Sequence, residues 1–454
     1  MNEHIPDLEL SYYAFDPDSI APERQAKIQR HTASCDECGQ RLNFYLVAED
    51  DLHDPMVWGT SSTALPASLQ LPPAIRAFTN RCTAEDADAD VLLAPFFSNP
   101  AKAMWANLPR QREFRTSGVV RRLNAHADSV AATEPATALI FADLARAIAD
   151  VLPHDLYPNN ALFELRGTAW KTRGHALLLL GRFDEAVDSL RCAEREYGRL
   201  TSPILSLADV DLARAAVYYQ LEELERAATH AERAEHTFAQ LGQEHRRLKA
   251  LLLRGSIRYL ALDLGTASAI FQQVIEYGEA ADSAHWIAQG SYARANCELD
   301  RGKIAEASML FHAAMVIFRE IGAEVHCVAT QWGLARVLLH SGRPADAASR
   351  LREVMRAFER MSRVMEVAFV GLDLADALVV LQQPKQVVKV AAHAFRILKE
   401  AGVVTSALTA LAYLKEAASH DRLSRELIHE IRTFMRRAER HPELLFVPPP
   451  EQQS

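Results

Sequence analysis

Residues 170–193 read WKTRGHALLLLGRFDEAVDSLRCA, and this stretch sets the pattern for most of the chain. Two runs with apolar residues at helical spacing flank a short turn, GRF at 181–183. Gly174 in the first run and Ala186 in the second are small, so two antiparallel helices can approach closely where these residues meet. The stretch therefore predicts a helix–turn–helix hairpin.

The same hairpin recurs along the chain with a constant period. Only three prolines fall between positions 160 and 440, as expected for consecutive long helices, and Pro344 and Pro384 stand at the same phase of the period, at two expected helix starts. One hairpin cannot bury both of its faces, so we expect the copies to stack. The small position of the first helix is occupied by Gly174, Ala215, Gly255, Ala295, Ala335 and Ala375. The matching position of the second helix is Ala186, Ala227, Ala267, Ala307 and Ala347, with Val387 as the exception.

This pattern resembles the tetratricopeptide repeat, with a longer period than the common one of about 34 residues. The resemblance implies an all-α fold in which the repeats form a right-handed α-solenoid with a 40-residue period. An ordinary alanine-rich helical domain is the alternative, but six copies in register argue against it.

The chain has 454 residues and a formal net charge of −9, and most of this charge lies at one end. Residues 1–60 contain 12 acidic and 4 basic side chains, a balance of −8. Such a charge disfavours binding to a nucleic-acid backbone. The longest uncharged apolar runs have about 12 residues, too few to cross a bilayer, and no signal peptide is visible. We therefore expect a cytoplasmic protein without a membrane or nucleic-acid partner.

The N-terminal region holds one cluster of metal-ligating residue types. His31, Cys35 and Cys38 have the spacing H-x3-C-x2-C, and His4 lies further upstream, near the start of the chain. Two thiolates and an imidazole one helical turn earlier can face one tetrahedral Zn²⁺. His4 is the predicted fourth ligand, with Asp7, Asp36 or water as the alternative. The pattern predicts one zinc ion, structural or redox-sensing, in this N-terminal region, called the head below (residues 1–60). Zinc would help such a small region to fold. The competing interpretation is that the cysteines are incidental.

With these residues, the head resembles the zinc-finger domain of bacterial anti-sigma factors. In that family an early His or Cys, followed by His-x3-Cys-x2-Cys, holds zinc between short helices that bind a sigma factor. His4, His31, Cys35 and Cys38 match this ligand set. The whole chain resembles bacterial zinc-finger/tetratricopeptide proteins associated with extracytoplasmic-function sigma factors. It departs from many anti-sigma factors because no transmembrane segment is visible, which favours a cytoplasmic sensor or scaffold.

The sequence thus predicts a small zinc-binding helical N-terminal domain followed by the solenoid. The expected divisions are an anti-sigma-type zinc-finger domain (1–50), a linker with short helices (51–115), an irregular opening repeat (116–160), six repeats (161–402), a capping helical pair (403–440) and a Pro-rich tail (441–454).

No phosphate-binding glycine loop, nucleophile elbow or zinc-hydrolase motif is found in the sequence, so we do not expect an enzyme. The first helices of the repeats line the concave face of such a solenoid. Aromatic and hydrogen-bonding side chains recur there at the repeat spacing, which suits a peptide or helical partner; the alternative is that they fill gaps between helices. The predicted partner-binding residues are Lys171, His175, Tyr219, Tyr259, Tyr292, Asn296, Trp332 and Arg336.

The leading hypothesis is a non-enzymatic cytoplasmic regulator of transcription. Its zinc-bound acidic head would bind a sigma factor of the extracytoplasmic-function type, aided by charge complementarity, and its array would bind a second protein or peptide. The alternative is a tetratricopeptide scaffold with a purely structural zinc site. Direct DNA binding by the head is a weaker hypothesis, because its −8 balance repels phosphates.

Overall fold

The structure is a computed structural model, in which the chain divides into two compact units, Met1–Asn80 and Arg81–Ser454. Each unit is described by itself. The described residues form helices and turns without a strand, and none of their helices is long and apolar enough to span a membrane. The described residues are Ile5, 22–35, Cys38, 73–98, 107–131, 133–401, 405–420, 423–440, Leu444 and Phe446.

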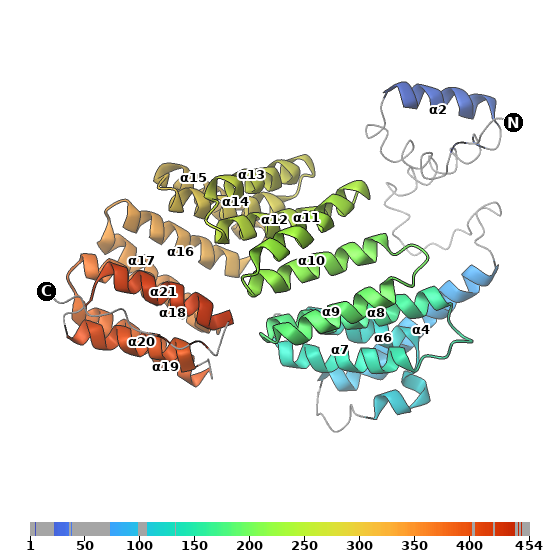
Figure 1. Ribbon diagram of the computed structural model, residues 1–454, viewed down its shortest axis with the longest axis horizontal. Coiled ribbons are helices and arrows are strands. Elements are labelled where there is room, and N and C mark those ends of the chain that lie inside the picture. The colour runs from blue at the N-terminus through green and yellow to red at the C-terminus, as the bar shows by residue number, and fades with distance from the viewer. Residues whose placement is uncertain are drawn as a thin grey trace. The chain divides into compact units, whose positions relative to one another are not determined.

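The second unit is an array of paired helices that follow one another along the chain (Figure 1). From Ile204 to Glu400 the helices are equal in length and start at even intervals, at Ile204, Leu224, Glu244 and so on to Pro384. This confirms the predicted all-α, tetratricopeptide-like solenoid and its period. The pairs are α6 (Ser117–Val130) with α7 (Pro135–Asp150), α8 (Asn159–Leu179) with α9 (Phe183–Tyr197), α10 (Ile204–Gln220) with α11 (Leu224–Gln240), α12 (Glu244–Leu260) with α13 (Leu264–Ala280), α14 (Ala284–Asp300) with α15 (Ile304–Glu320), α16 (Glu324–His340) with α17 (Pro344–Arg360), and α18 (Val364–Val380) with α19 (Pro384–Glu400).

The small residues at the predicted crossing points are buried in all six repeats. Gly255 shows why size matters there, since a Cβ atom at this position would lie 2.3 Å from Cε1 of Phe271. Val387, the exception in the sequence pattern, is also fully buried, so the sixth repeat accepts a larger side chain at that crossing.

The short turns between helices repeat the same backbone conformation. In ten of these turns the middle residue has a positive φ, and the next N–H bonds to a carbonyl near the end of the preceding helix, as Gln243 N does to Phe238 O at 2.8 Å. Glycine occupies half of these positions, including Gly242 and Gly322. The middle residues are Gly181, Glu222, Gly242, Leu262, Asp282, Gly302, Gly322, Gly342, Ser362 and Gln382.

Where short helices were expected before residue 115, the structure has one helix of 26 residues, α4 (Pro73–Ser98), followed by two 3₁₀ turns. The carboxylate of Glu85 in α4 accepts hydrogen bonds from Ser117 N at 2.9 Å and from the hydroxyl of Tyr157 at 2.7 Å. This acceptor satisfies an N–H group at the start of α6 that has no partner within its own helix. A Cβ atom at Gly118 would lie 2.3 Å from the carbonyl oxygen of Glu85, so glycine permits this contact between α4 and α6.

Two helices, α20 (Thr405–Ser419) and α21 (Arg425–Arg440), end the array. Helix α21 packs against α20 and also against α18, and it buries Ile431 and Met435 completely. In this predicted capping pair, Arg432 of the charged stretch is turned toward α18, where it contacts Asp373.

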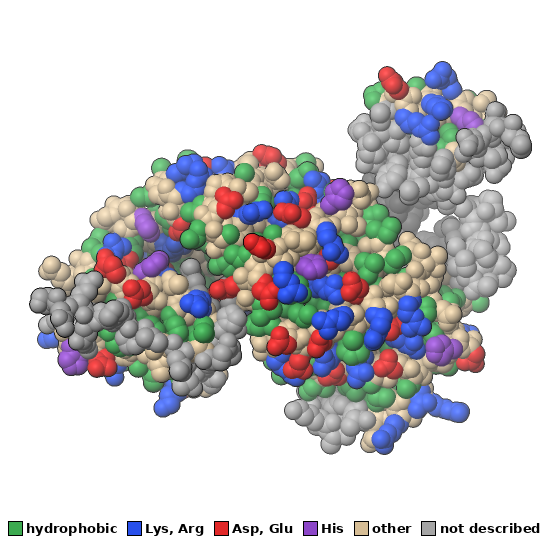
Figure 2. All heavy atoms as spheres, in the orientation of Figure 1, with side chains coloured by type: hydrophobic (Ala, Val, Ile, Leu, Met, Phe, Trp, Pro, Cys, Tyr) green, Lys and Arg blue, Asp and Glu red, His purple; other side chains and the backbone are tan. Residues whose placement is uncertain are grey.

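The first unit contains α2 (Pro22–Ser34), in which Ile28 is fully buried. Lys27 and Arg30 are exposed on this helix, and Figure 2 shows Lys and Arg side chains on its surface. Apart from Glu23, the acidic residues of the head lie outside the described residues. The described helix of the head is therefore basic, although the head as a whole is acidic.

Candidate functional site

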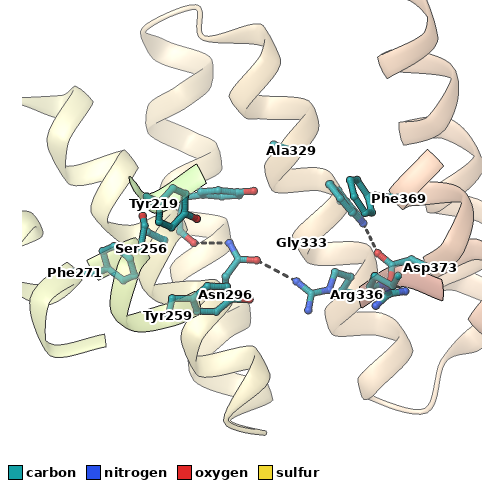
Figure 3. Close-up of a pocket in the computed structure, with 14 residues that line it drawn as sticks. Tyr219, Ser256, Tyr259, Phe271, Asn296, Ala329, Gly333, Arg336, Phe369 and Asp373 are labelled. Carbon is teal, nitrogen blue, oxygen red and sulfur yellow. Dashed lines mark hydrogen bonds and ion pairs between the residues drawn. The ribbon is translucent and has the colours of Figure 1, made fainter. Parts of the chain in front are cut away.

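Six of the eight predicted partner-binding side chains line a single cavity of about 280 Å³. They come from four successive first helices, α10, α12, α14 and α16, and Figure 3 shows Tyr219, Tyr259, Asn296 and Arg336 among them. The repeat spacing brings them together, because equivalent positions of stacked helices lie side by side. These six residues are Tyr219, Tyr259, Tyr292, Asn296, Trp332 and Arg336.

The other two residues, Lys171 and His175, lie apart from this cavity. They line a second hollow of about 390 Å³, to which α8 and α10 contribute. Lys171 Nζ lies 3.3 Å from a carboxylate oxygen of Asp209, and His175 Nδ1 lies 3.8 Å from Asp128. The predicted set therefore divides between two hollows of the array.

A chain of hydrogen bonds fixes the polar side of the six-residue cavity (Figure 3). Asn296 donates from Nδ2 to the carbonyl of Tyr292 at 3.0 Å, and its Oδ1 accepts from Nη1 of Arg336 at 3.1 Å. Arg336 also donates from Nη2 to Asp300 at 2.8 Å, and the hydroxyl of Tyr259 donates to the same carboxylate. These bonds join three repeats and hold the amide and the guanidinium in one orientation.

Asp373 and Arg432 also line this cavity, although neither is among the residues predicted from the sequence. The Asp373 carboxylate is buried, accepts a hydrogen bond from Nε1 of Trp332 at 2.6 Å, and lies 2.5 Å from a guanidinium nitrogen of Arg432. A signal was available for Asp373, because it and Asp376 are the only charged residues between Glu366 and Lys385. Arg432 gave no such signal, since it stands among other basic residues of α21.

The charges of the cavity stabilise one another. Burial lowers the pKa of Arg336, but the carboxylates of Asp373 and Asp300 outweigh this effect and raise the pKa above its usual value. Burial also raises the pKa of Tyr292, so its hydroxyl stays protonated. Near neutral pH the cavity therefore presents a charged guanidinium beside neutral aromatic side chains.

The predicted metal ligands of the head also lie close together. The ligand atoms of His31, Cys35 and Cys38 all lie within 4.8 Å of one another, and Cys38 is buried. The backbone helps, because Cys35 N bonds to His31 O at 2.9 Å and continues the turn of α2. Nε2 of His31 is buried and has no hydrogen-bond partner among the described residues. His4, the predicted fourth ligand, lies outside the described residues.

This donor set suits zinc. Two thiols and an imidazole are the ligand types of structural zinc sites, and a buried ring nitrogen without a partner is costly unless something binds it. No other group of three such side chains comes equally close within the described part of the chain.

Comparison with known proteins identifies the repeats. A model of the tetratricopeptide repeat family matches residues 286–360, which span α14 to α17, so the chain contains repeats of this family. A search of curated protein sequences found no match.

The chain is also similar to several solved structures. Aspartyl phosphate phosphatase F from Bacillus subtilis is similar over 88% of this chain and 95% of its own, with 14% identity and a TM-score of 0.50. The apo form of the quorum sensor NprR from B. thuringiensis covers 72% of this chain and 99% of its own, with 10% identity and a TM-score of 0.46. A Rap protein complexed with Competence and Sporulation Factor covers 70% and 100%, with 15% identity and a TM-score of 0.43. At these identities the likeness concerns the fold alone.

Proposed function

We propose that the protein is a non-enzymatic regulatory scaffold whose concave groove binds a short segment of a partner protein. The observation that carries this proposal is the cavity to which four successive first helices contribute six side chains of the types that bind peptides. Its volume of about 280 Å³ suits a few side chains rather than a folded domain.

The chemistry of the cavity supports a peptide ligand. Aromatic rings of Tyr219, Tyr292 and Trp332 offer large apolar contact at little cost in conformational entropy. Asn296 and Arg336 are held in place by their own hydrogen bonds, so their remaining donors are oriented before a ligand arrives. Preorganised groups of this kind bind more tightly than mobile ones, because less entropy is lost on binding.

Affinity capture of partner segments on the full-length protein tests this proposal. Tyr219→Ala and Trp332→Ala should each weaken capture by about tenfold or more, since aromatic anchors dominate such interfaces. Met309→Ala is the matched control, because Met309 is 68% exposed on α15 and does not line the cavity. Circular dichroism checks that each variant is folded. Equal capture by the folded Tyr219→Ala, Trp332→Ala and Met309→Ala variants would refute the proposal.

We also propose that the head binds one Zn²⁺ through His31, Cys35 and Cys38, with His4 as the fourth ligand. The three clustered ligand atoms and the unpartnered Nε2 of His31 support it. Bound zinc would hold α2 and the cysteine turn together and would add to the stability of a small domain. Purified full-length protein should contain about one zinc per chain, and Cys35→Ser/Cys38→Ser should contain none, while Cys192→Ser should keep the metal. A metal-free wild-type protein, purified without chelators, would contradict this proposal.

For the head we propose a regulatory role, as a cytoplasmic anti-sigma-like module that binds a sigma factor. This part rests on the resemblance and on the acidic composition of residues 1–60. Pull-down with full-length protein separates it from a scaffold with a purely structural zinc. The regulator loses its sigma factor when Cys35 and Cys38 are replaced, whereas the scaffold keeps every partner. Salt-dependent retardation of DNA by the protein would instead favour direct DNA binding.

A further inference from the structure

The groove that holds the six-residue cavity is closed at its C-terminal end by α21. This helix packs on α18 and sends Arg432 into the lining of the cavity. Nearby, Arg425 of the same helix pairs with Asp376 through two contacts of 2.5 and 2.8 Å, outside the lining. A segment lying along the first helices toward this end therefore meets Arg432 of α21.

At this end of the cavity the carboxylate and the guanidiniums differ in how many of their hydrogen-bonding atoms have described partners. Both oxygens of the buried Asp373 have donors, Trp332 on one and Arg432 on the other. A guanidinium carries five N–H groups. The described contacts use two nitrogens of Arg336, toward Asn296 and Asp300, and one of Arg432.

The charges of the lining residues also favour a ligand that accepts hydrogen bonds. Two guanidiniums and one carboxylate line the cavity, while Asp300, a second carboxylate that accepts a hydrogen bond from Arg336, is outside the lining. An arriving ammonium group would find the one lining carboxylate already occupied. An arriving acceptor would find N–H donors on two guanidiniums that are only 17% and 20% exposed, where a charged hydrogen bond is stronger than in water.

We infer that the ligand of the groove is a short peptide that places a carboxylate between Arg336 and Arg432 at the α21 end. This inference rests on the proposed peptide-binding function and specifies its chemistry. The carboxylate belongs either to the C-terminus of the peptide or to an acidic side chain near it. Helix α21 thus contributes specificity as well as closing the groove.

Random pentapeptide pools, selected on the full-length protein and read by mass spectrometry, test the inference. Four pools are compared: free acids and C-terminal amides, each with or without Asp and Glu. At least one pool that contains a carboxylate should be enriched about tenfold over the amide pool that lacks acidic residues. Enrichment of the acid-free free acids identifies the C-terminus as the source, and enrichment of amides that contain Asp or Glu identifies a side chain.

Variants of α21 locate the effect. Arg432→Gln should remove the preference for carboxylates, whereas Arg425→Gln, the matched control on the same helix, should keep it, because Arg425 lies outside the lining. Equal enrichment of all four pools by the wild-type protein would overturn the inference and leave the proposed function standing. If no pool binds, the proposed function and the inference both fall. The comparison of pools needs no variant, so it holds even if Arg432→Gln disturbs α21.

Discussion

The guanidinium of Arg432 lies 2.5 Å from the carboxylate of Asp373, although the two residues are far apart in the sequence. This contact fastens the last helix of the array to the first helix of the sixth repeat, on the face that carries the cavity. Because Asp373 is buried and Arg432 is 20% exposed, the pair is shielded from much of the solvent that weakens surface ion pairs.

Asp373→Asn should therefore loosen α21. The change removes one charge and leaves Arg432 unpaired, so we expect the free energy of unfolding to fall by about 2 kcal/mol. Hydrogen exchange should accelerate in α21 more than in α8 and α9, since repeats contact mainly their neighbours. Asp346→Asn is the control, because its pair with Arg343 is exposed on both sides and should contribute under about 0.5 kcal/mol. Equal exchange in the two variants would count against this role.

Gly255→Ala should destabilise the protein. The added methyl group would lie 2.3 Å from the ring of Phe271, so α12 and α13 would have to separate, at a cost of about 1–3 kcal/mol. Gly265→Ala gives the opposite expectation, because no atom lies within 4 Å of its Cβ position and alanine favours a helix by about 0.5–1 kcal/mol. Denaturant titration measures both. A neutral Gly255→Ala would mean that this crossing is looser than described.

Leu262→Gly should stabilise the protein by about 1 kcal/mol. Leu262 has φ +61° in the turn between α12 and α13, a left-handed conformation that is costly for residues with a Cβ atom. Its side chain is 82% exposed, so little packing is lost with it. Gly302→Ala, at φ +78° in the equivalent turn between α14 and α15, should cost a similar amount. Thermal unfolding of both variants checks these two expectations. Shifts of the melting temperature in the same direction would disprove the explanation by backbone conformation.

Cys297 should make the stability depend on pH at alkaline values. Burial raises the pKa of its thiol from 9.0 to about 12. The folded protein therefore keeps a proton that the unfolded chain loses above about pH 9. The resulting contribution to stability is complete below pH 9 and is lost as the pH rises toward about 12.

Chemical denaturation at several pH values checks this expectation. Cys297→Ala should show a smaller loss of stability from pH 9 upward than the wild-type protein. At pH 8 a thiol reagent should modify the half-exposed Cys192 and leave Cys297 unmodified in the folded protein. An unchanged alkaline slope in Cys297→Ala would rule out the thiol as its cause.

Much of the array could be predicted from the sequence because the residues that a repeat needs recur at the same positions in every copy. Gly174 and its equivalents are small wherever two helices cross, and the turns recur at even spacing with the same backbone conformation. The requirements for small crossing residues and for regular turns act over a few residues, and they recur in each of the six repeats. The same spacing predicted that Asn296 and Arg336 lie on the concave face, and both line the cavity.

The contacts at the two ends of the array could not be predicted from the repeat pattern. In sequence, Arg432 is one of several arginines of an amphipathic helix, and nothing local distinguishes it from a solvated residue. Likewise, Glu85 lies in an alanine- and aspartate-rich stretch, and its value as an acceptor for Ser117 depends on a separate helix further along the chain. Both interactions exist only after the helices have docked.

The period and the small residues at the crossings could be predicted from the sequence because they reflect local helix geometry and the packing of neighbouring pairs. Where the groove ends is a different matter. Its closure depends on α21 returning to α18 and on Asp373 being buried between Trp332 and Arg432. Such a network of charge and hydrogen bonds gains its strength from the exclusion of water, which the folded array alone provides.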